Sequence, residues 1–397
     1  MILRIEGDFY SILGSNYDGA SDEYIERDIN SKLFQTQNIN IKIHPIFLQK
    51  KKLKITSLEF EGDNQEIKNT INEINSDIQR QEDNSKGYRC EEPNTWSVFY
   101  LLKELITALS SSNYNFYRGQ GSNWATRPSI FRPLKLIGDI EDETNFYEDF
   151  EKLYQQVSRE YPDNIKYIEL EHDELIDERA DELATLQHYG LPTSLLDVTE
   201  NPFIALLFML ESDEFSNPQI EFYKFNPQKD VDDSLLTFTH KKNNNKRIKA
   251  QKGAFINYDK INRFIKIDGK KWKLSDRYRK IDRILVNIKL DIDKYGSYLD
   301  NLLQASQELE EEKEKEDLRK VIKVEKDKFF PEDGSGTTEE EIKKNENEIF
   351  ENLRQELMKK LNEFHYFQRD LYPDFNDYLV HLKKKYKRYS SQSSFTL

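Results

Sequence analysis

The sequence predicts an α+β fold in which a small central mixed or antiparallel sheet is flanked by helices. Alternating apolar and polar residues, as in residues 219–226, predict strands, and apolar residues at helical spacing, as in residues 64–81, predict helices. Hydrophobic residues make up only 37% of the chain, but it contains 22 Tyr and 24 Phe. Because each large aromatic side chain buries much area, such a chain can still close a core.

The first part of the chain, residues 1–90, is predicted to form an N-terminal α/β subdomain or a lid on the rest. Residues 1–15, 38–48 and 52–62 are interpreted as strands, and residues 64–81 as a helix. The apolar positions of this helix are Ile67, Ile71 and Ile74. The residues after it lack any periodicity, which indicates a linker.

The middle part, residues 91–260, is predicted to be the core of the protein. We expect Asn94 or Thr95 to cap its first helix and Asn201 to cap its last, with Pro202 in the first turn. This last helix is apolar on all sides, which predicts burial all round. Helices are expected at residues 94–109, 142–158, 174–190 and 200–210, and strands at residues 114–119, 219–226 and 247–258.

The last part, residues 261–397, is predicted to be a helical region that closes the core domain. A long charged helix is expected over residues 300–329, where Glu316 and Lys320 form a favourable pair. Such a helix offers a surface for self-association or for a partner protein. The next helix is expected to begin at Thr337 or Thr338.

Composition limits the classes of partner. The net charge of −14 argues against general nucleic-acid binding and against binding to an anionic membrane. The longest apolar run, residues 203–210, is far shorter than the roughly 18 residues that a membrane span needs. A single cysteine, Cys90, allows no internal disulfide. Together with the lack of a signal-peptide pattern, this predicts a cytoplasmic protein.

Several common catalytic patterns are missing from the sequence. There is no GxxxxGK[ST], GxGxxG or GxSxG pattern, so the usual phosphate loops and the serine elbow are absent. His172 lies among carboxylates but has no second histidine at zinc spacing, so no metal site is predicted. A nuclease would need a carboxylate cluster for metal, which we do not find.

Two sequence blocks contain residues that could bind a ligand or take part in catalysis. In the first, FYRGQG, Arg118 follows Tyr117 at a strand end, and Gly119 is expected to let a ligand approach the backbone. An arginine fork suits a phosphate or a carboxylate, although a buried structural arginine paired with a carboxylate is the alternative. In the second, QHYGLPTSLLDVTENPFIALLF, polar residues directly precede the most apolar segment of the chain.

These blocks resemble the bacterial FRG domain family, named after its (Phe/Tyr)-Arg-Gly motif. A third block, RIKAQKGAF, is similar as well, and the resemblance spans residues 95–257. The family usually has Gly-Leu-Pro-Thr-Arg-Leu-Leu-Asp-Trp-Thr in the second block. This chain has Ser194 in place of the arginine and Val198 in place of the tryptophan, so ligand contacts by those two side chains are not expected here.

The order of the three blocks also looks like that of ADP-ribosyltransferases. That resemblance implies NAD as the substrate and an activity of glycosyl transfer. It implies an effector or toxin, and the family context adds defence against phage. The matching positions are Arg118 in the first block, Thr199 with Ala205 and Phe208 in the second, and Gln251 with Gly253 and Phe255 in the third.

The resemblance assigns a role to each candidate residue. Arg118, with Tyr117 and Gly119, would hold a phosphate or a ribose hydroxyl, and Thr199 would orient the nicotinamide ribose. The ring of His188 or Tyr189 would stack on nicotinamide. Asp197 or Glu200 would stabilise the cation that forms when nicotinamide leaves. Gln251 would position the acceptor.

Each of these residues also has a structural interpretation. His188 could cap the carbonyls of the preceding helix, and Thr199 could be an ordinary capping residue. Asp197 could be an N-terminal helix cap or a buried partner of Arg118. Two functions from different classes therefore stay open: an NAD-using effector, and a non-catalytic module that binds a nucleotide or a protein. We expect Arg118, His188, Asp197 and Gln251 to share one cleft.

Overall fold

The fold comes from a computed structural model of the chain. The expected strand at residues 1–15, the caps Asn94 and Thr95, and Cys90 lie outside the residues that the structure describes. The described residues are 23, 25–47, 49–84, 97–132, 146–226, 234–239, 250–268, 271–308, 312–331, 338–373, 375, 378–379 and 381–383.

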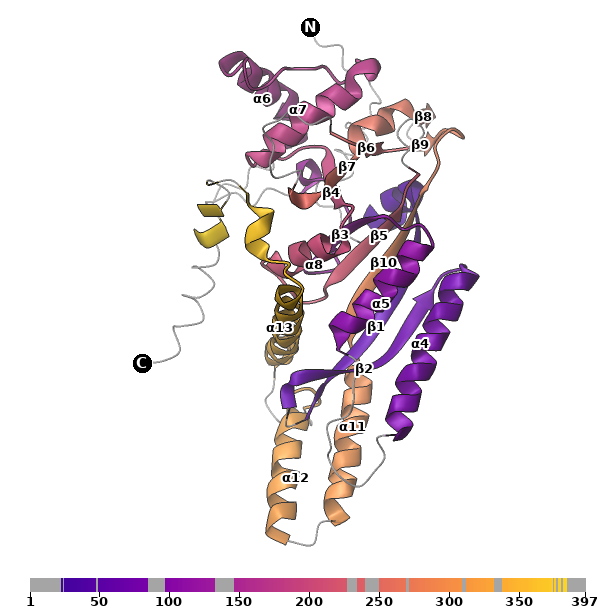
Figure 1. The fold of residues 1–397 in the computed structure, drawn as a ribbon, viewed down its shortest axis with the longest axis vertical. Helices are drawn as coiled ribbons and strands as arrows, with labels where there is room; N and C mark the ends of the chain where they lie inside the picture. The colour runs from indigo at the N-terminus through magenta and orange to yellow at the C-terminus, as the bar shows by residue number, and fades with distance from the viewer. Residues whose placement is uncertain are drawn as a thin grey trace.

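Within these residues the central feature is one mixed sheet with the strand order β2-β1-β10-β5-β3-β4-β7-β6 (Figure 1). It confirms the α+β class, although the sheet is larger than expected. A separate two-stranded sheet pairs β8 (Ile265–Asp268) with β9 (Lys271–Leu274). The central strands are β1 (Phe34–Ile46), β2 (Gln49–Glu61), β3 (Phe116–Gln120), β4 (Leu195–Thr199), β5 (Gln219–Lys224), β6 (Leu236–Thr237), β7 (Gly253–Asn257) and β10 (Ile281–Leu290).

The strand order contradicts the expectation that residues 1–90 stand apart. Strand β1 pairs in parallel with β10, and β10 pairs with β5, so the N-terminal strands continue the sheet of the core. The alternating isoleucines of β1 are buried by this pairing; Ile39, Ile41 and Ile43 are all 0% exposed. The limits near residues 90 and 260 therefore do not divide the sheet, and the N-terminal strands are not a lid.

Strand β10 lies in the part of the chain that was expected to be helical. Its sequence, IDRILVNIKL, is rich in β-branched residues, which favour strands. It forms the connection between the N-terminal strands and the core strands, with β1 on one side and β5 on the other. A short apolar run such as this one can belong to a buried strand or a buried helix, which is why periodicity alone does not identify it.

Helices cover both faces of the sheet and produce two hydrophobic cores (Figure 1). The first core contains the buried side of α5 and nearly all of α8, whose apolar character on every side is thus explained. The second core is formed by α6, α7 and the strands β4 and β7. The helices are α4 (Gln65–Asn84), α5 (Val98–Ser111), α8 (Pro202–Glu211) and α13 (Glu339–Glu363) in the first core, and α6 (Phe146–Glu160) and α7 (Ile176–His188) in the second.

Several predicted helix ends are confirmed. The Asn201 side chain accepts a hydrogen bond from the Phe203 N–H at the start of α8. Thr338 caps α13 in a capping box with Glu341. Helix α5 begins later than expected, at Val98, directly after Ser97.

The expected long helix over residues 300–329 is instead part of a helical hairpin that projects from the sheet (Figure 1). Helix α11 (Ile292–Ala305) ends in a turn, and α12 (Glu312–Asp327) runs back along it. The hydroxyl of Tyr295 donates to Glu325 at 3.1 Å across the hairpin. Packing of the apolar sides of two short helices against each other replaces one long solvated helix, because it removes apolar surface from water.

Candidate functional site

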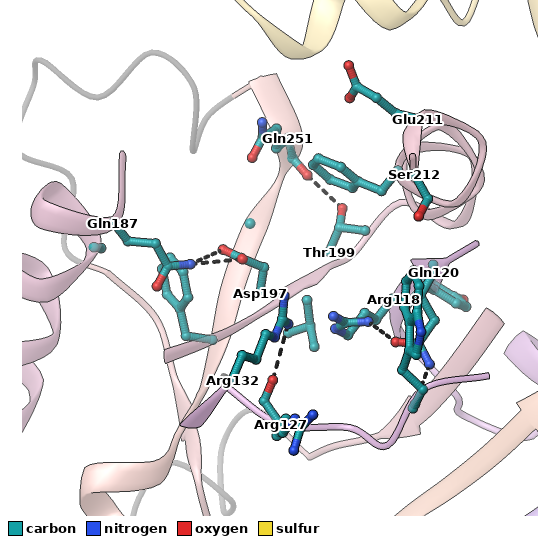
Figure 2. A pocket seen from close by; sticks show the side chains of 18 of the residues that line it. Arg118, Gln120, Arg127, Arg132, Gln187, Asp197, Thr199, Glu211, Ser212 and Gln251 are labelled. Atoms are coloured by element: carbon teal, nitrogen blue, oxygen red, sulfur yellow. Dashed lines mark hydrogen bonds between the residues drawn. The ribbon is translucent and has the colours of Figure 1, made fainter. Parts of the chain in front are cut away.

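The candidate site opens where strands β3 and β4 separate. A single residue pair, Tyr117 with Thr199, joins these two strands. On its other edge β3 pairs with β5 at five positions, and β4 pairs with β7 at five positions. A cavity of about 620 Å³ lies at the separation, and Figure 2 shows Arg118 and Asp197 on its opposite sides. The neighbouring strands therefore hold both walls while leaving the gap between them open.

The cavity brings together most of the residues that the sequence selects. Its lining includes Tyr117, Arg118, Gly119, His188, Asp197, Thr199 and Gln251. Tyr189 does not line the cavity and is 79% exposed. The centroids of its ring and of the His188 ring lie 4.9 Å apart. The roles expected for these residues stay predictions, since their shared location identifies a site and not a reaction.

Arg118 lies next to a buried carboxylate, that of Glu221. Its Nη1 donates to Gln120 Oε1 at 2.8 Å and lies 3.4 Å from Glu221 Oε1 on β5. Glu221 is 0% exposed and also accepts from Thr126 Oγ1 at 3.0 Å and from the Tyr223 hydroxyl. Burial raises the pKa of Tyr223 well above its ordinary value and the charge of Glu221 raises it further, so the hydroxyl keeps its proton.

This carboxylate connects the cavity to the N-terminal strands. Arg283 on β10 lies 4.0 Å from Glu221 and donates to Thr126 Oγ1 at 2.8 Å. Its Nη2 also donates to Glu26 at 2.7 Å and to Thr36 on β1 at 2.9 Å. Neither Glu221 nor Arg283 was predicted, because no sequence spacing links residues on five different segments. The one visible signal was a charged residue inside each of two apolar strands.

Gly119 lines the cavity, and it also has a structural function that was not expected. A Cβ atom there would lie 2.0 Å from the backbone carbonyl oxygen of Ala205 on α8. Glycine is therefore needed so that α8 can pack closely against β3. At Gly121 a Cβ would likewise lie 2.0 Å from the carbonyl oxygen of Glu214. The glycines of the FYRGQG block thus set the distance between the sheet and the segment that forms one cavity wall.

Asp197 is an exposed residue on β4 with an oriented carboxylate. The Gln187 amide donates to its two oxygens at 2.9 and 2.8 Å. Gln187 is oriented in turn because its own oxygen accepts from the Thr193 hydroxyl. The alternative that Asp197 is buried is therefore wrong. The buried partner of Arg118 is Glu221.

Thr199 and Gln251 join the cavity strands to each other and to the C-terminal part. Thr199 Oγ1 donates to the Gln251 carbonyl at 2.6 Å and accepts from the Asn201 N–H at 3.1 Å. Gln251 lies in a helical turn just before β7, and not on the expected strand. Its side-chain Nε2 donates to the Leu371 carbonyl at 3.1 Å. In this conformation both residues serve the structure of the cavity wall.

The C-terminal part contributes one further wall that the sequence did not reveal. Glu211, at the end of α8, accepts from the Tyr372 hydroxyl and lies 2.9 Å from Nδ1 of His381. Tyr372 and Glu211 both line the cavity. Beyond residues 95–257, the sequence carries a weaker echo of the family pattern in YFQRDLYPDFNDYL, residues 366–379. It gave no indication that this segment would meet α8.

Three arginines line the cavity from one continuous stretch of chain: Arg118, Arg127 and Arg132. Arg132 Nη2 donates to the Arg127 carbonyl at 3.1 Å, and its side chain extends toward Asp197 (Figure 2). Desolvation inside the cavity lowers the pKa of Arg132 to about 10 and Arg118 lowers it as well, whereas Asp197 opposes the shift. Arg132 still carries its charge at neutral pH.

Two other kinds of feature are absent from the described part of the chain. It contains no group of three or more His, Cys, Asp or Glu side chains that could hold a metal ion. It also contains no helix that is both long enough and apolar enough to span a membrane.

Comparison with known proteins identifies the segment that forms most of the site. A family model described as the FRG domain matches residues 113–217, which include β3, β4, α7 and α8. No curated protein and no solved structure matches the chain. The match ends before Gln251 and the C-terminal wall. Over residues 113–217 this chain therefore carries an FRG domain.

Proposed function

We propose that the protein is an FRG-domain effector whose cavity binds NAD and supports an ADP-ribosyltransferase-like reaction. The observation that carries this proposal is the placement of Arg118 and Asp197 on the two strands that separate at the cavity. An arginine on one wall suits the diphosphate of a dinucleotide, and a carboxylate on the other suits a cation. The volume of about 620 Å³ falls within the range of about 300–1,000 Å³ typical of ligand pockets.

The proposed reaction breaks the bond between the nicotinamide nitrogen and the anomeric carbon of its ribose. The bonding electrons leave with nicotinamide, which departs as a neutral molecule, and the ribose becomes an oxocarbenium-like cation. An acceptor hydroxyl, amine or water then forms the new bond to that carbon and releases a proton. The exposed carboxylate of Asp197, oriented by Gln187, would stabilise the cation in the transition state.

One observation favours a second function, a nucleotide-binding module without catalysis. The Thr199 hydroxyl is already bonded to Gln251 and Asn201, and the Gln251 amide to Leu371. Orienting a ribose through Thr199 would require one of these bonds to be exchanged. Under this second function Arg118 and its neighbours hold the ligand, and no bond of the ligand is broken.

Labelled NAD distinguishes the two functions. The purified protein is incubated with NAD labelled in the nicotinamide ring, and both retained label and released nicotinamide are measured. We expect release, and we expect Asp197→Asn to retain NAD while its release rate falls about 10²–10³-fold, the usual effect of removing one electrostatic stabiliser. The matched control is Asp163→Asn, an exposed aspartate far along the chain from the cavity strands.

Arg118 requires a conservative variant because it faces buried Glu221. Arg118→Lys keeps the positive charge beside that carboxylate but loses the guanidinium fork, so we expect weaker NAD binding with an unchanged melting temperature. NAD that binds without nicotinamide release would favour the non-catalytic module. A protein that neither binds nor cleaves NAD would contradict both uses of this dinucleotide.

The proposed role in defence against phage has support only from the family resemblance. It is tested by expressing the wild type and Asp197→Asn in the same bacterial host and counting plaques. Equal plaque numbers for the wild type and an empty vector across a phage panel would contradict it.

A further inference from the structure

The segment between β3 and the second core presents arginines on a rigid backbone. The Gln120 side chain donates to the Trp124 carbonyl at 2.7 Å, and the Thr126 N–H donates to Glu26 at 3.1 Å. Further along, the Ile130 N–H donates to the Thr193 carbonyl at 3.2 Å, just before β4. Residues 122–132 are thus attached to three other parts of the fold. Side chains on such a backbone are pre-positioned for a ligand.

One cavity arginine, Arg132, differs from the structural arginines of this chain. Arg179 is 0% exposed and contacts two carboxylates, Asp259 at 2.8 Å and Glu151. Arg283 is 1% exposed and contacts Glu26 at 2.7 Å. Arg132, in contrast, is an exposed side chain on the cavity wall whose Nη2 donates to a backbone carbonyl. A purely structural role does not require an arginine to point into a cavity.

Like charges gather on this wall. Arg118, Arg127 and Arg132 all line the same cavity. Desolvation is the largest cause of the lowered pKa of Arg132, and the charges of Arg118 and Arg127 lower it further. Crowded guanidinium groups repel one another, and an anion between them removes that cost. Two guanidinium forks match the oxygens of two linked phosphate groups better than a single carboxylate, because each fork can bind one phosphate bidentately.

An aromatic side chain lines the same cavity as these charges. Trp124 also lines the cavity, and its side chain is 39% exposed. An indole face offers a stacking surface for the base or sugar that a diphosphate carries. Inorganic anions would use only the arginines, whereas a nucleoside diphosphate would use the ring as well.

We propose that Arg127 and Arg132 form a diphosphate subsite of this cavity, with organic diphosphates of the ADP or ADP-ribose type as its ligands and Trp124 beside the attached nucleoside. The subsite rests on the proposed function because it belongs to the same cavity, and it makes that function more specific. It places the diphosphate at the wall formed by residues 122–132, from which Arg132 extends toward Asp197, and leaves the wall of Glu211 to the other end of the ligand.

The test measures binding of four probes to the full chain by calorimetry: inorganic pyrophosphate, orthophosphate, ADP-ribose and adenosine. We expect pyrophosphate to bind more tightly than orthophosphate, and ADP-ribose more tightly than either. Arg132→Gln and Arg127→Gln should each weaken ADP-ribose binding about tenfold or more, the effect of losing a charge-assisted contact. Arg159→Gln, an exposed arginine on α6, serves as the matched control and should bind as the wild type does.

A charge-preserving variant separates the fork from the charge. Arg132→Lys should lose less affinity than Arg132→Gln for pyrophosphate, and melting temperatures without ligand should stay equal among the variants. Unchanged ADP-ribose affinity in both glutamine variants would overturn the subsite, as would pyrophosphate binding no tighter than orthophosphate.

The result is independent of the NAD reaction. If ADP-ribose and pyrophosphate bind through these arginines but nicotinamide is never released, the subsite stands and catalysis fails. If nicotinamide is released and the Michaelis constant for NAD is unchanged in Arg132→Gln, the subsite fails and the proposed function stands.

Discussion

The two halves of the central sheet differ in how fully their strands pair. Strand β1 pairs with β10 at ten consecutive positions, from Phe34 with Ile281 to Ile43 with Leu290. Strands β3 and β4 meet at one position only, and the cavity lies where they part. The fully paired half satisfies its backbone groups within the sheet, whereas the open half leaves room for a ligand. The half of the sheet with the most complete strand pairing is therefore not the half that contains the site.

The strand between the halves, β5, carries the carboxylate on which both depend. Glu221 lies beside Arg118 on the open side and beside Arg283 on the paired side. A buried charge that serves two arginines is costly to remove, because each arginine then loses part of its compensation. The comparison thus predicts that changes at β5 affect stability most, changes at the cavity wall less, and changes in the outer helices least.

The largest effect is expected for Glu221→Gln. Removing a buried charge that pairs with Arg118 and Arg283 should lower the free energy of unfolding by about 3–5 kcal/mol. Chemical denaturation of the wild type and the variant at neutral pH measures it. Tyr223→Phe is the control, because it removes only one hydrogen bond to the same carboxylate and should cost about 1 kcal/mol. Equal stability of Glu221→Gln and the wild type would show that the two halves are not joined through this residue.

A smaller loss is expected for Gly119→Ala. The added Cβ would meet the Ala205 carbonyl at 2.0 Å, so α8 must move away from β3, at a cost of about 1–3 kcal/mol. Thermal melting measures the loss, and ligand binding should fall with it because α8 ends in the cavity wall. Gly190→Ala is the contrast: nothing lies within 4 Å there, and only its φ of +91° opposes a side chain. A variant of Gly119 that melts as the wild type but fails to bind ligand would restore the ligand-approach interpretation of this glycine.

The smallest effect is expected for Glu356→Gln on α13. Burial raises the pKa of Glu356 above its ordinary value, against the lowering effect of nearby groups such as the Val98 backbone at the start of α5. The folded state therefore binds this proton more tightly than the unfolded state does. Its contribution to stability is present at pH values below the ordinary carboxyl pKa and is lost as the pH rises through the raised value.

At neutral pH the variant should accordingly be more stable than the wild type, by no more than about 1 kcal/mol. The difference should vanish near pH 4, where the wild-type carboxyl is largely protonated in both states. Melting temperatures measured from pH 4 to pH 8 follow the change, with Glu348→Gln, an exposed glutamate on the same helix, as the control. A variant that is less stable than the wild type at neutral pH would reverse the expected sign.

The sequence by itself determined the local elements and the membership of the cavity. The apolar run of α8, the caps at Asn201 and Thr338, and the alternating strands follow from spacing and side-chain type, which act over a few residues. The same blocks identified residues that the structure places around one cavity, including Arg118, Asp197 and Gln251. Local rules suffice for the helix, the caps and the strands, because each depends on neighbours in the chain, whereas the shared cavity was expected from the resemblance of three separate blocks to known families.

Only the tertiary structure decided which distant residues meet. It placed β10 between the N-terminal strands and the core, made Glu221 the partner of Arg118, and bonded the Gln251 amide to the Leu371 carbonyl. It also assigned Gly119 to close packing against α8. Strand order, buried ion pairs and close backbone approaches depend on burial and on contacts between segments far apart in the chain. Neither spacing nor composition encodes which of several possible partners a residue will have.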